Sequence, residues 1–162
     1  MSGPVAAGAP AVDDGIDWRT CARGTLVGIA VIVPTTILRA VLDREIDDFD
    51  DSGWIYPLFV LILIGYLAAG WVAGRARPDL PLMHGTVAGL GVFVVWVPAR
   101  VVIWAVRDEG RELFLGRDAA LRPGQVFGHL VIAAAMGMLG AVMAARLGRR
   151  RATDPQPEPR PR

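Results

Sequence analysis

The sequence predicts an all-α protein, an integral membrane bundle of four helices arranged as two tandem helical hairpins. Of its 162 residues, 53% are hydrophobic, and they collect in four long blocks with most of the charges between them. A hydrocarbon core of about 30 Å needs about 20 helical residues to cross it, and each block has that length. The residues left over are too few to give four buried helices the polar shell of a soluble protein.

We predict four transmembrane helices, at about residues 22–42, 54–74, 84–106 and 125–147. Together they form one membrane domain over residues 21–148. The first helix is not a cleaved signal peptide, because it is as long as a span and no small-residue cleavage site follows it. Residues 1–20 and the Arg/Pro-rich residues 149–162 have the composition of disordered tails.

Arginine placement predicts that both chain ends lie in the cytoplasm. Apart from Arg39 and Arg100, ten arginines fall on the side of the termini and five on the opposite side, and cytoplasmic loops retain arginine during insertion. The lack of Lys and Asn is typical of a GC-rich bacterial genome, so we expect a bacterial plasma membrane. The arginine cluster after the fourth helix is short and has no aromatic partners, which argues against nucleic-acid binding.

The first and third helices resemble copies of one another. Residues 24–33 align without gaps to residues 85–94 with half of the positions identical, and at the same offset Arg39 aligns with Arg100. The second and fourth helices match less well, and the best match pairs residues 73–75 with residues 144–146. We therefore predict a parallel internal repeat, with the two hairpins related by an axis near the membrane normal.

Small-residue motifs recur in every helix. Lipid gives helices no hydrophobic reason to associate, so close backbone approach through small residues must supply the packing. We assign helix packing to eight glycines: Gly24, Gly28, Gly70, Gly74, Gly85, Gly89, Gly137 and Gly140. Packing within one chain is favoured over a homodimer seam. We expect the bundle to be tight in its cytoplasmic half, and looser and more polar in the outer half that holds Pro34, Pro98 and Trp96.

Three residues are candidates for binding a ligand or a lipid headgroup: Arg39, Arg100 and His129. The two arginines lie in the outer leaflet within reach of the headgroups, so snorkelling to lipid phosphate is the favoured interpretation. The alternative is a cationic pair that faces the bundle interior and binds an anion. His129 lies at a similar depth, whereas His84 lies at the inner end of the third helix, so the two histidines do not share a metal ion. Structural or interfacial roles are the favoured interpretation for both histidines.

Several other features indicate no chemistry. The acidic loop that contains Asp48 and Asp50 begins like a calcium loop, but Phe59 occupies the position of the bidentate Glu, which excludes an EF-hand. Cys21 is a lone cysteine and forms no internal disulfide. No motif of a nucleophile with a positioned base occurs, so we expect no catalytic residue, no metal, no cofactor and no enzymatic activity.

Two local structures are also predicted. Within the helices, Thr25, Thr35, Thr36 and Thr86 are expected to bond their own backbone carbonyls. In the outer loop 107–124, apolar residues are expected to form one face of a short interfacial helix: Leu113, Phe114, Ala120 and Leu121.

The segment Ala69–Arg75, followed by Leu82–Gly89, resembles a group of small four-helix bacterial membrane proteins. These proteins share a Gly/Ala-rich end of the second helix, a basic turn, and a His-Gly or Lys-Gly start of the third. The resemblance implies a four-span plasma-membrane protein of uncharacterised function and assigns no catalytic residue.

These observations favour a structural or accessory membrane protein that binds lipid or a membrane partner protein. The alternative is a small transporter or channel subunit that acts as a homo-oligomer around Arg39 and Arg100. An intramembrane enzyme is the least favoured class, because no acid–base constellation is present.

Overall fold

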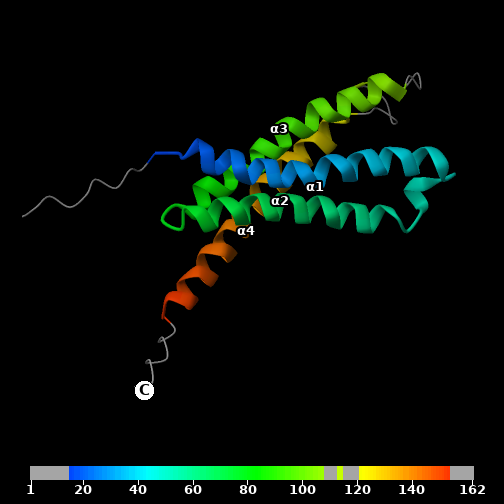
Figure 1. Ribbon diagram of the computed structural model, residues 1–162. Helices are drawn as coiled ribbons and strands as arrows, with labels where there is room; N and C mark the ends of the chain where they lie inside the picture. Colours follow the sequence, from blue (N-terminus) through cyan, green and yellow to red (C-terminus); the bar gives the residue numbers. More distant parts are fainter. Residues whose placement is uncertain (1–14, 108–112, 115–120, 154–162) are drawn as a thin grey trace, which may run out of the picture.

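The computed structural model describes residues 15–107, 113–114 and 121–153, and over these residues it is all-helical, which confirms the predicted fold class. Its elements are α1 (Trp18–Glu45), the short 3-10 helix η1 (Phe49–Asp51), α2 (Ile55–Ala76), α3 (Pro81–Arg107) and α4 (Pro123–Thr153). All four α-helices are long and apolar enough to cross a membrane (Figure 1). These are the features of a multi-pass membrane protein.

The first helix begins earlier, and the last helix ends later, than the sequence predicts. α1 begins at Trp18 rather than at residue 22, because the Asp17 carboxylate caps it by accepting the backbone N–H groups of Arg19 and Thr20 at 3.1 and 3.2 Å. α4 continues through its arginines to Thr153, since arginine is a good helix former and the backbone keeps its hydrogen bonds beyond the apolar core. Parts of both predicted tails are therefore helical. Residues 1–14 and 154–162 lie outside the described residues.

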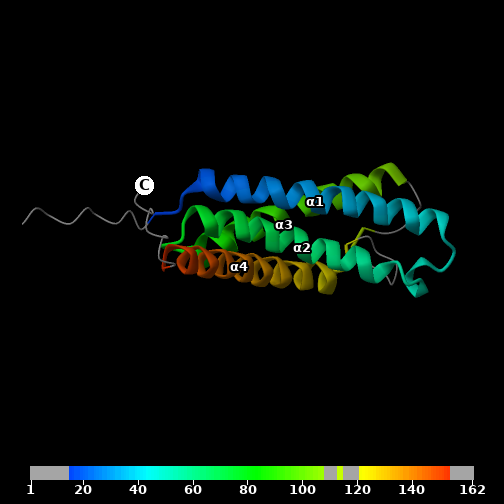
Figure 2. The same cartoon turned by 60° about the horizontal axis from the view of Figure 1, so that its bottom comes forward.

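The start of α1, the α2–α3 turn and the end of α4 lie at one end of the bundle, called the terminal end here (Figure 2). The α1–α2 connection and the start of α4 lie at the other, the distal end. Helices α1 and α4 each pack against both α2 and α3, and α2 also packs against α3. Among the described residues, α1 and α4 do not contact each other. The helices thus form a rhombus with α2 and α3 across its short diagonal.

This arrangement departs from the symmetry that we predicted. A two-fold axis along the bundle would exchange α1 with α3 and α2 with α4, so the α2–α3 contact would require an equal α4–α1 contact. The described residues show the first contact and not the second. The two hairpins lie side by side instead, with α1 and α3 in contact. The internal duplication itself stays a prediction.

The small residues of the two hairpins nevertheless pack in the same register. In the first hairpin, Gly28 of α1 faces Gly65 and Ala69 of α2. In the second, Gly89 of α3 faces Ala133 and Gly137 of α4. Ala69 in the first hairpin and Gly137 in the second therefore occupy equivalent positions. The sequence alignment of residues 73–75 with 144–146 is shifted from this structural equivalence by three residues. The sequence match was weak there because alanine and glycine repeat at many spacings.

Close backbone contact is concentrated in the terminal half and the centre of the bundle. All eight predicted packing glycines lie against another helix, and a Cβ on any of them would come too close to neighbouring atoms. Gly137 occupies the meeting point of three helices: a Cβ on Gly70 of α2 would overlap its backbone, and its own Cβ would meet Gly85 and Gly89 of α3.

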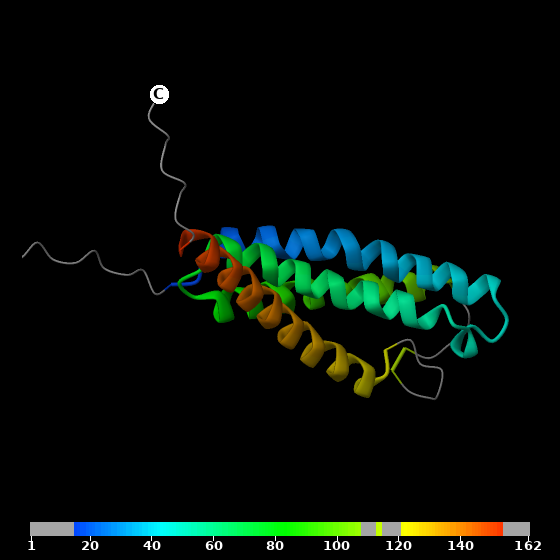
Figure 3. The ribbon, with the colours of Figure 1, turned by 90° about the horizontal axis from the view of Figure 1, so that it is seen from below.

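Side-chain size then separates the helices toward the distal end. Near the terminal end the buried residues are small, such as Ala73 and Ala141, whereas Ile62, Trp96 and Leu121 fill the core at the distal end. Larger side chains hold helix axes farther apart. Figure 3 shows α4 diverging from α2 toward the start of α4. The helices are therefore closest around these glycine and alanine contacts, and α2 and α4 separate from there toward the distal end.

Threonine hydroxyls follow the predicted pattern at three of four positions. Thr35 and Thr36 donate to the Val31 and Ile32 carbonyls beside Pro34, both at 2.7 Å, and Thr86 bonds its own helix in the same way. Thr25 was predicted wrongly. Its hydroxyl donates across the helix contact to the Ala88 carbonyl of α3 at 3.1 Å, because Gly91 brings α3 close enough to accept it.

The distal connections fold back onto the core. Phe49 of η1 is buried, and Leu121 packs in the core cluster while its backbone N–H donates to the Leu113 carbonyl at 2.9 Å. The predicted interfacial helix is wrong for the described part of this loop: Leu121 is buried, only Phe114 is exposed, and neither lies in a helix. Ala120 lies outside the described residues. Burying leucine in the opened bundle end removes more apolar surface from water than an interfacial position does.

We expect Gly137→Ala to destabilise the bundle and Gly148→Ala to spare it. The first places a methyl group against the α3 backbone and should cost about 1–3 kcal/mol by overpacking. Gly148 lies on the same helix, and no described atom of a neighbouring element lies within 4 Å of a Cβ placed there. Gly148→Ala therefore only raises the helix propensity of α4. Thermal unfolding in detergent measures both, and equal melting temperatures would contradict the packing role of Gly137.

We also expect the start of α1 to fray in acid. The Thr20 hydroxyl donates to the Asp17 carboxylate at 2.8 Å, and this bond and the backbone N–H bonds hold the Asp17 pKa below its ordinary value of 3.8. The capping contribution is therefore complete above that value and is lost as pH falls through the lowered pKa. Hydrogen exchange of the first-turn amides, corrected for intrinsic rates, should show this loss in the wild type. In Asp17→Asn the corrected protection should not change over the same pH range.

Candidate functional site

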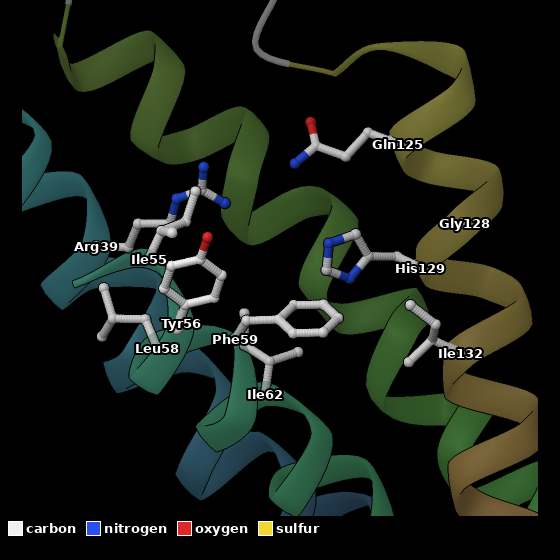
Figure 4. Close-up of a pocket in the computed structure, with 10 residues that line it drawn as sticks. All are labelled: Arg39, Ile55, Tyr56, Leu58, Phe59, Ile62, Gln125, Gly128, His129 and Ile132. Atoms are coloured by element: carbon white, nitrogen blue, oxygen red, sulfur yellow. The ribbon is translucent and has the colours of Figure 1, made fainter. Parts of the chain in front are cut away.

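A cavity of about 390 Å³ lies at the distal end, where α4 diverges from α2. Its walls come from the last turns of α1, the first turns of α2 and the first turns of α4 (Figure 4). Tyr56 and Phe59 of α2 line it and are 74% and 43% exposed, so they form its open rim. The cavity volume lies within the range of small-molecule sites.

The deeper part of the cavity is apolar. Ile62 and Ile132 line it on facing sides of the α2–α4 cleft, with Leu58 and Phe59 on the α2 side, whereas Ile55 lies beside Arg39 at the outer end (Figure 4). The lining extends toward the terminal end only as far as Ile62 and Ile132; beyond them, α2 and α4 meet at the glycine contacts. The cavity is therefore a pocket that closes halfway along the bundle.

The outer part of the cavity is polar. The Arg39 guanidinium, the Tyr56 hydroxyl and the Gln125 amide point toward the same end, and the His129 imidazole lies across from Arg39 (Figure 4). Arg39 is half-buried, and it also interacts with another part of the chain. One end of the pocket thus offers hydrogen-bond donors and a positive charge, and the other offers only hydrocarbon.

His129 is held in place by aromatic stacking. Its ring lies against Trp96 of α3 with centroids 4.3 Å apart and planes inclined by 21°, and Trp96 stacks in turn on Phe93. The His129 side chain is only 9% exposed, and its Nδ1 makes no hydrogen bond within the described part of the chain. Since buried polar atoms are normally bonded, this nitrogen is an unsatisfied buried atom of a residue that lines the pocket.

The three predicted ligand residues converge on this region. The charges of both Arg39 and Arg100 act electrostatically on His129, so α1, α3 and α4 bring two cations and an imidazole to one end of the bundle. Arg39 and His129 line the pocket. Arg100 approaches from α3 and is not among the lining residues described.

His84 has a different environment at the terminal end. Its Nε2 accepts the backbone N–H of Asp17 at 3.1 Å, so its Nδ1 carries the proton and donates to the Leu80 carbonyl at 2.9 Å. The Cys21 thiol donates to the His84 carbonyl at 3.8 Å. His84 is fully buried and joins the start of α1 to the start of α3, which is a structural role.

No metal-binding cluster is found in the part of the chain that the structure describes, where no three His, Cys, Asp or Glu side chains gather. In the acidic loop, Asp48 adopts a left-handed conformation at φ 53° and leads into η1. There the Ser52 hydroxyl donates to the Phe49 carbonyl at 2.6 Å. This loop folds on its own backbone and brings Phe49 into the core.

The uncharged residues of the pocket were not predicted from the sequence. Tyr56, Gln125 and Gly128 line it, and Trp96 supports His129. A weak signal was present: Gln125 and His129 lie four residues apart and therefore share one face at the start of α4. The other partners come from helices distant in sequence. Only their tertiary packing shows that they face this histidine.

No protein-family model, curated protein or solved structure matches this chain. The resemblance to small four-helix bacterial membrane proteins therefore stays a prediction, and the functional interpretation depends on the pocket itself.

We expect the two histidines to respond oppositely to the same substitution. His129→Phe keeps an aromatic ring against Trp96 and removes the unbonded Nδ1, so it should leave stability unchanged or raise it by about 1 kcal/mol. His84→Phe loses both hydrogen bonds of a fully buried ring and should cost about 1–3 kcal/mol. Thermal unfolding in detergent distinguishes them; a large loss in His129→Phe would mean that this ring has a bonded structural role.

Proposed function

We propose that this protein is an accessory protein of a bacterial plasma membrane that holds a membrane lipid in the distal pocket. One observation carries the proposal: the pocket is apolar toward the membrane centre and polar, with Arg39, toward the membrane surface. A lipid has the same order of parts, an apolar chain below a polar headgroup. In this proposal both chain ends face the cytoplasm, so the pocket belongs to the outer leaflet, in agreement with the arginine distribution.

The outer surface of the helices supports a lipid environment around the pocket. Large apolar side chains are exposed along the bundle, among them Leu26, Ile64, Val94 and Val131. A soluble monomer rarely exposes so much apolar surface. The pocket rim, with Phe59 and Tyr56, is continuous with this surface, so a lipid chain enters sideways from the bilayer.

The closed pocket favours lipid binding over transport. A transport path must reach the other side of the membrane, but the pocket lining ends at Ile62 and Ile132. Beyond them, the Gly70 and Gly137 backbones are in contact. A small transporter or channel subunit acting as a homo-oligomer would have to place its path between chains.

The test is to fill the pocket without disturbing the fold. No described atom lies within 4 Å of a Cβ at Gly128, which lines the pocket, so Gly128→Leu adds bulk only to the empty space. We expect this variant to fold normally and to lose most of the lipid that remains bound to the wild type through detergent purification. Native mass spectrometry counts the bound lipids.

Gly124→Leu is the matched control. Gly124 also lies in the first turn of α4 with open space around its Cβ, but it does not line the pocket. This variant has the same composition and nearly the same position, and it should retain wild-type lipid. If the wild type carried no lipid, or if both variants lost it equally, the proposed function would be wrong.

A further inference from the structure

We infer that the polar end of the distal pocket recognises the phosphate of an anionic phospholipid, with Arg39 as the main cationic contact and His129 as a hydrogen-bonding partner across from it. This inference rests on the proposed function and adds the chemical class of the lipid. It follows from the energetics of lipid binding inside a bilayer, from the charges at the pocket and from the unsatisfied histidine.

Selectivity must come from the polar end. A lipid chain that moves from the bilayer into an apolar pocket exchanges one hydrocarbon environment for another, so the pocket wall contributes fit but little binding free energy. The walls of Phe59, Ile62 and Ile132 accept any acyl chain of suitable shape. What distinguishes one lipid from another is the headgroup, which lies beside Arg39, Tyr56 and Gln125 (Figure 4).

The charges at that end favour an anion. Arg39 lines the pocket, and the electrostatic influence of Arg39 and Arg100 overlaps at His129. A guanidinium matches the geometry of phosphate oxygens and donates charge-assisted hydrogen bonds, which are stronger than neutral ones. Tyr56 and Gln125 add uncharged donors to the same end. Among the described residues that line the pocket, none is Asp or Glu.

His129 supplies a second, buried contact. Trp96 holds the ring so that it faces the pocket, and Nδ1 has no hydrogen-bonding partner in the described chain. Both ring nitrogens of His84 form hydrogen bonds, and these bonds determine which nitrogen carries the proton. In His129, no hydrogen bond at Nδ1 imposes such a choice. The ring can therefore offer an N–H donor to a phosphate oxygen without losing an existing bond at Nδ1.

The experiment measures headgroup selection by the full-length chain. The protein is placed in bilayer discs with equal amounts of phosphatidylglycerol and phosphatidylcholine of the same acyl chains, and native mass spectrometry gives the ratio of the two lipids bound. We expect the wild type to prefer the anionic lipid and Arg39→Gln to reduce this preference about tenfold, the effect of one charge-assisted hydrogen bond. His129→Phe should reduce it less, since it removes an uncharged contact.

Arg44→Gln is the matched control, because Arg44 lies on the same helix, is exposed and does not line the pocket. It should keep the preference within about twofold, as expected for an exposed charge. Equal losses in both arginine variants would show general surface attraction and overturn the inference. So would an unchanged preference in Arg39→Gln. In either case the proposed function stands if Gly128→Leu still empties the pocket.

A further arm distinguishes a lipid phosphate from a free one. Inorganic phosphate is added to the same discs at increasing concentration. If a headgroup is the natural occupant, the bound lipid ratio should not change. Displacement of phosphatidylglycerol by inorganic phosphate, with phosphate protecting the wild type but not Arg39→Gln against thermal unfolding, would assign the site to a soluble anion and overturn the lipid inference.

Discussion

Backbone contact around Gly137 is the constraint on which the rest of the structure depends. Here the α4 backbone lies against Gly70 of α2 on one side and Gly85 and Gly89 of α3 on the other. In hydrocarbon, helices gain nothing by hiding apolar side chains, so this close approach is the main source of association. It also explains why the central helices of the rhombus are α2 and α3, which both reach α4 while α1 does not.

The distal pocket is a consequence of that contact. Helices that touch around Gly137 and carry Ile62 and Trp96 toward the distal end must diverge there, because those side chains do not fit at backbone-contact distance. Divergence creates a space at the depth where Arg39 and His129 lie. Leu121 fills part of it from the loop before α4, and the remainder is the pocket. The close helix packing at the glycines and the distal pocket thus have the same structural origin.

The two histidines have different roles because the folded chain surrounds them with different partners. Both are buried. The sequence placed them at opposite ends of the bundle, and only His129 was named there as a ligand candidate. His84 has both nitrogens bonded by backbone groups and links α1 to α3. His129 has an aromatic support and an unbonded nitrogen beside two arginines. The sequence contains no local signal for this difference, because the partners are main-chain groups in one case and residues of other helices in the other.

The sequence by itself determined the number of helices, their approximate bounds and the glycines at their contacts, since helix hydrogen bonds are local and apolar length is read along one chain. It did not determine which helices are neighbours. The predicted two-fold relation was wrong for that reason: hairpins related by rotation or by translation have the same sequence repeat. Only the tertiary structure decided that Thr25 bonds Ala88, that Leu121 is buried, and that Tyr56 and Gln125 face Arg39. Such contacts depend on the crossing and splay of helices, which arise from the summed fit of many side chains rather than from any one segment.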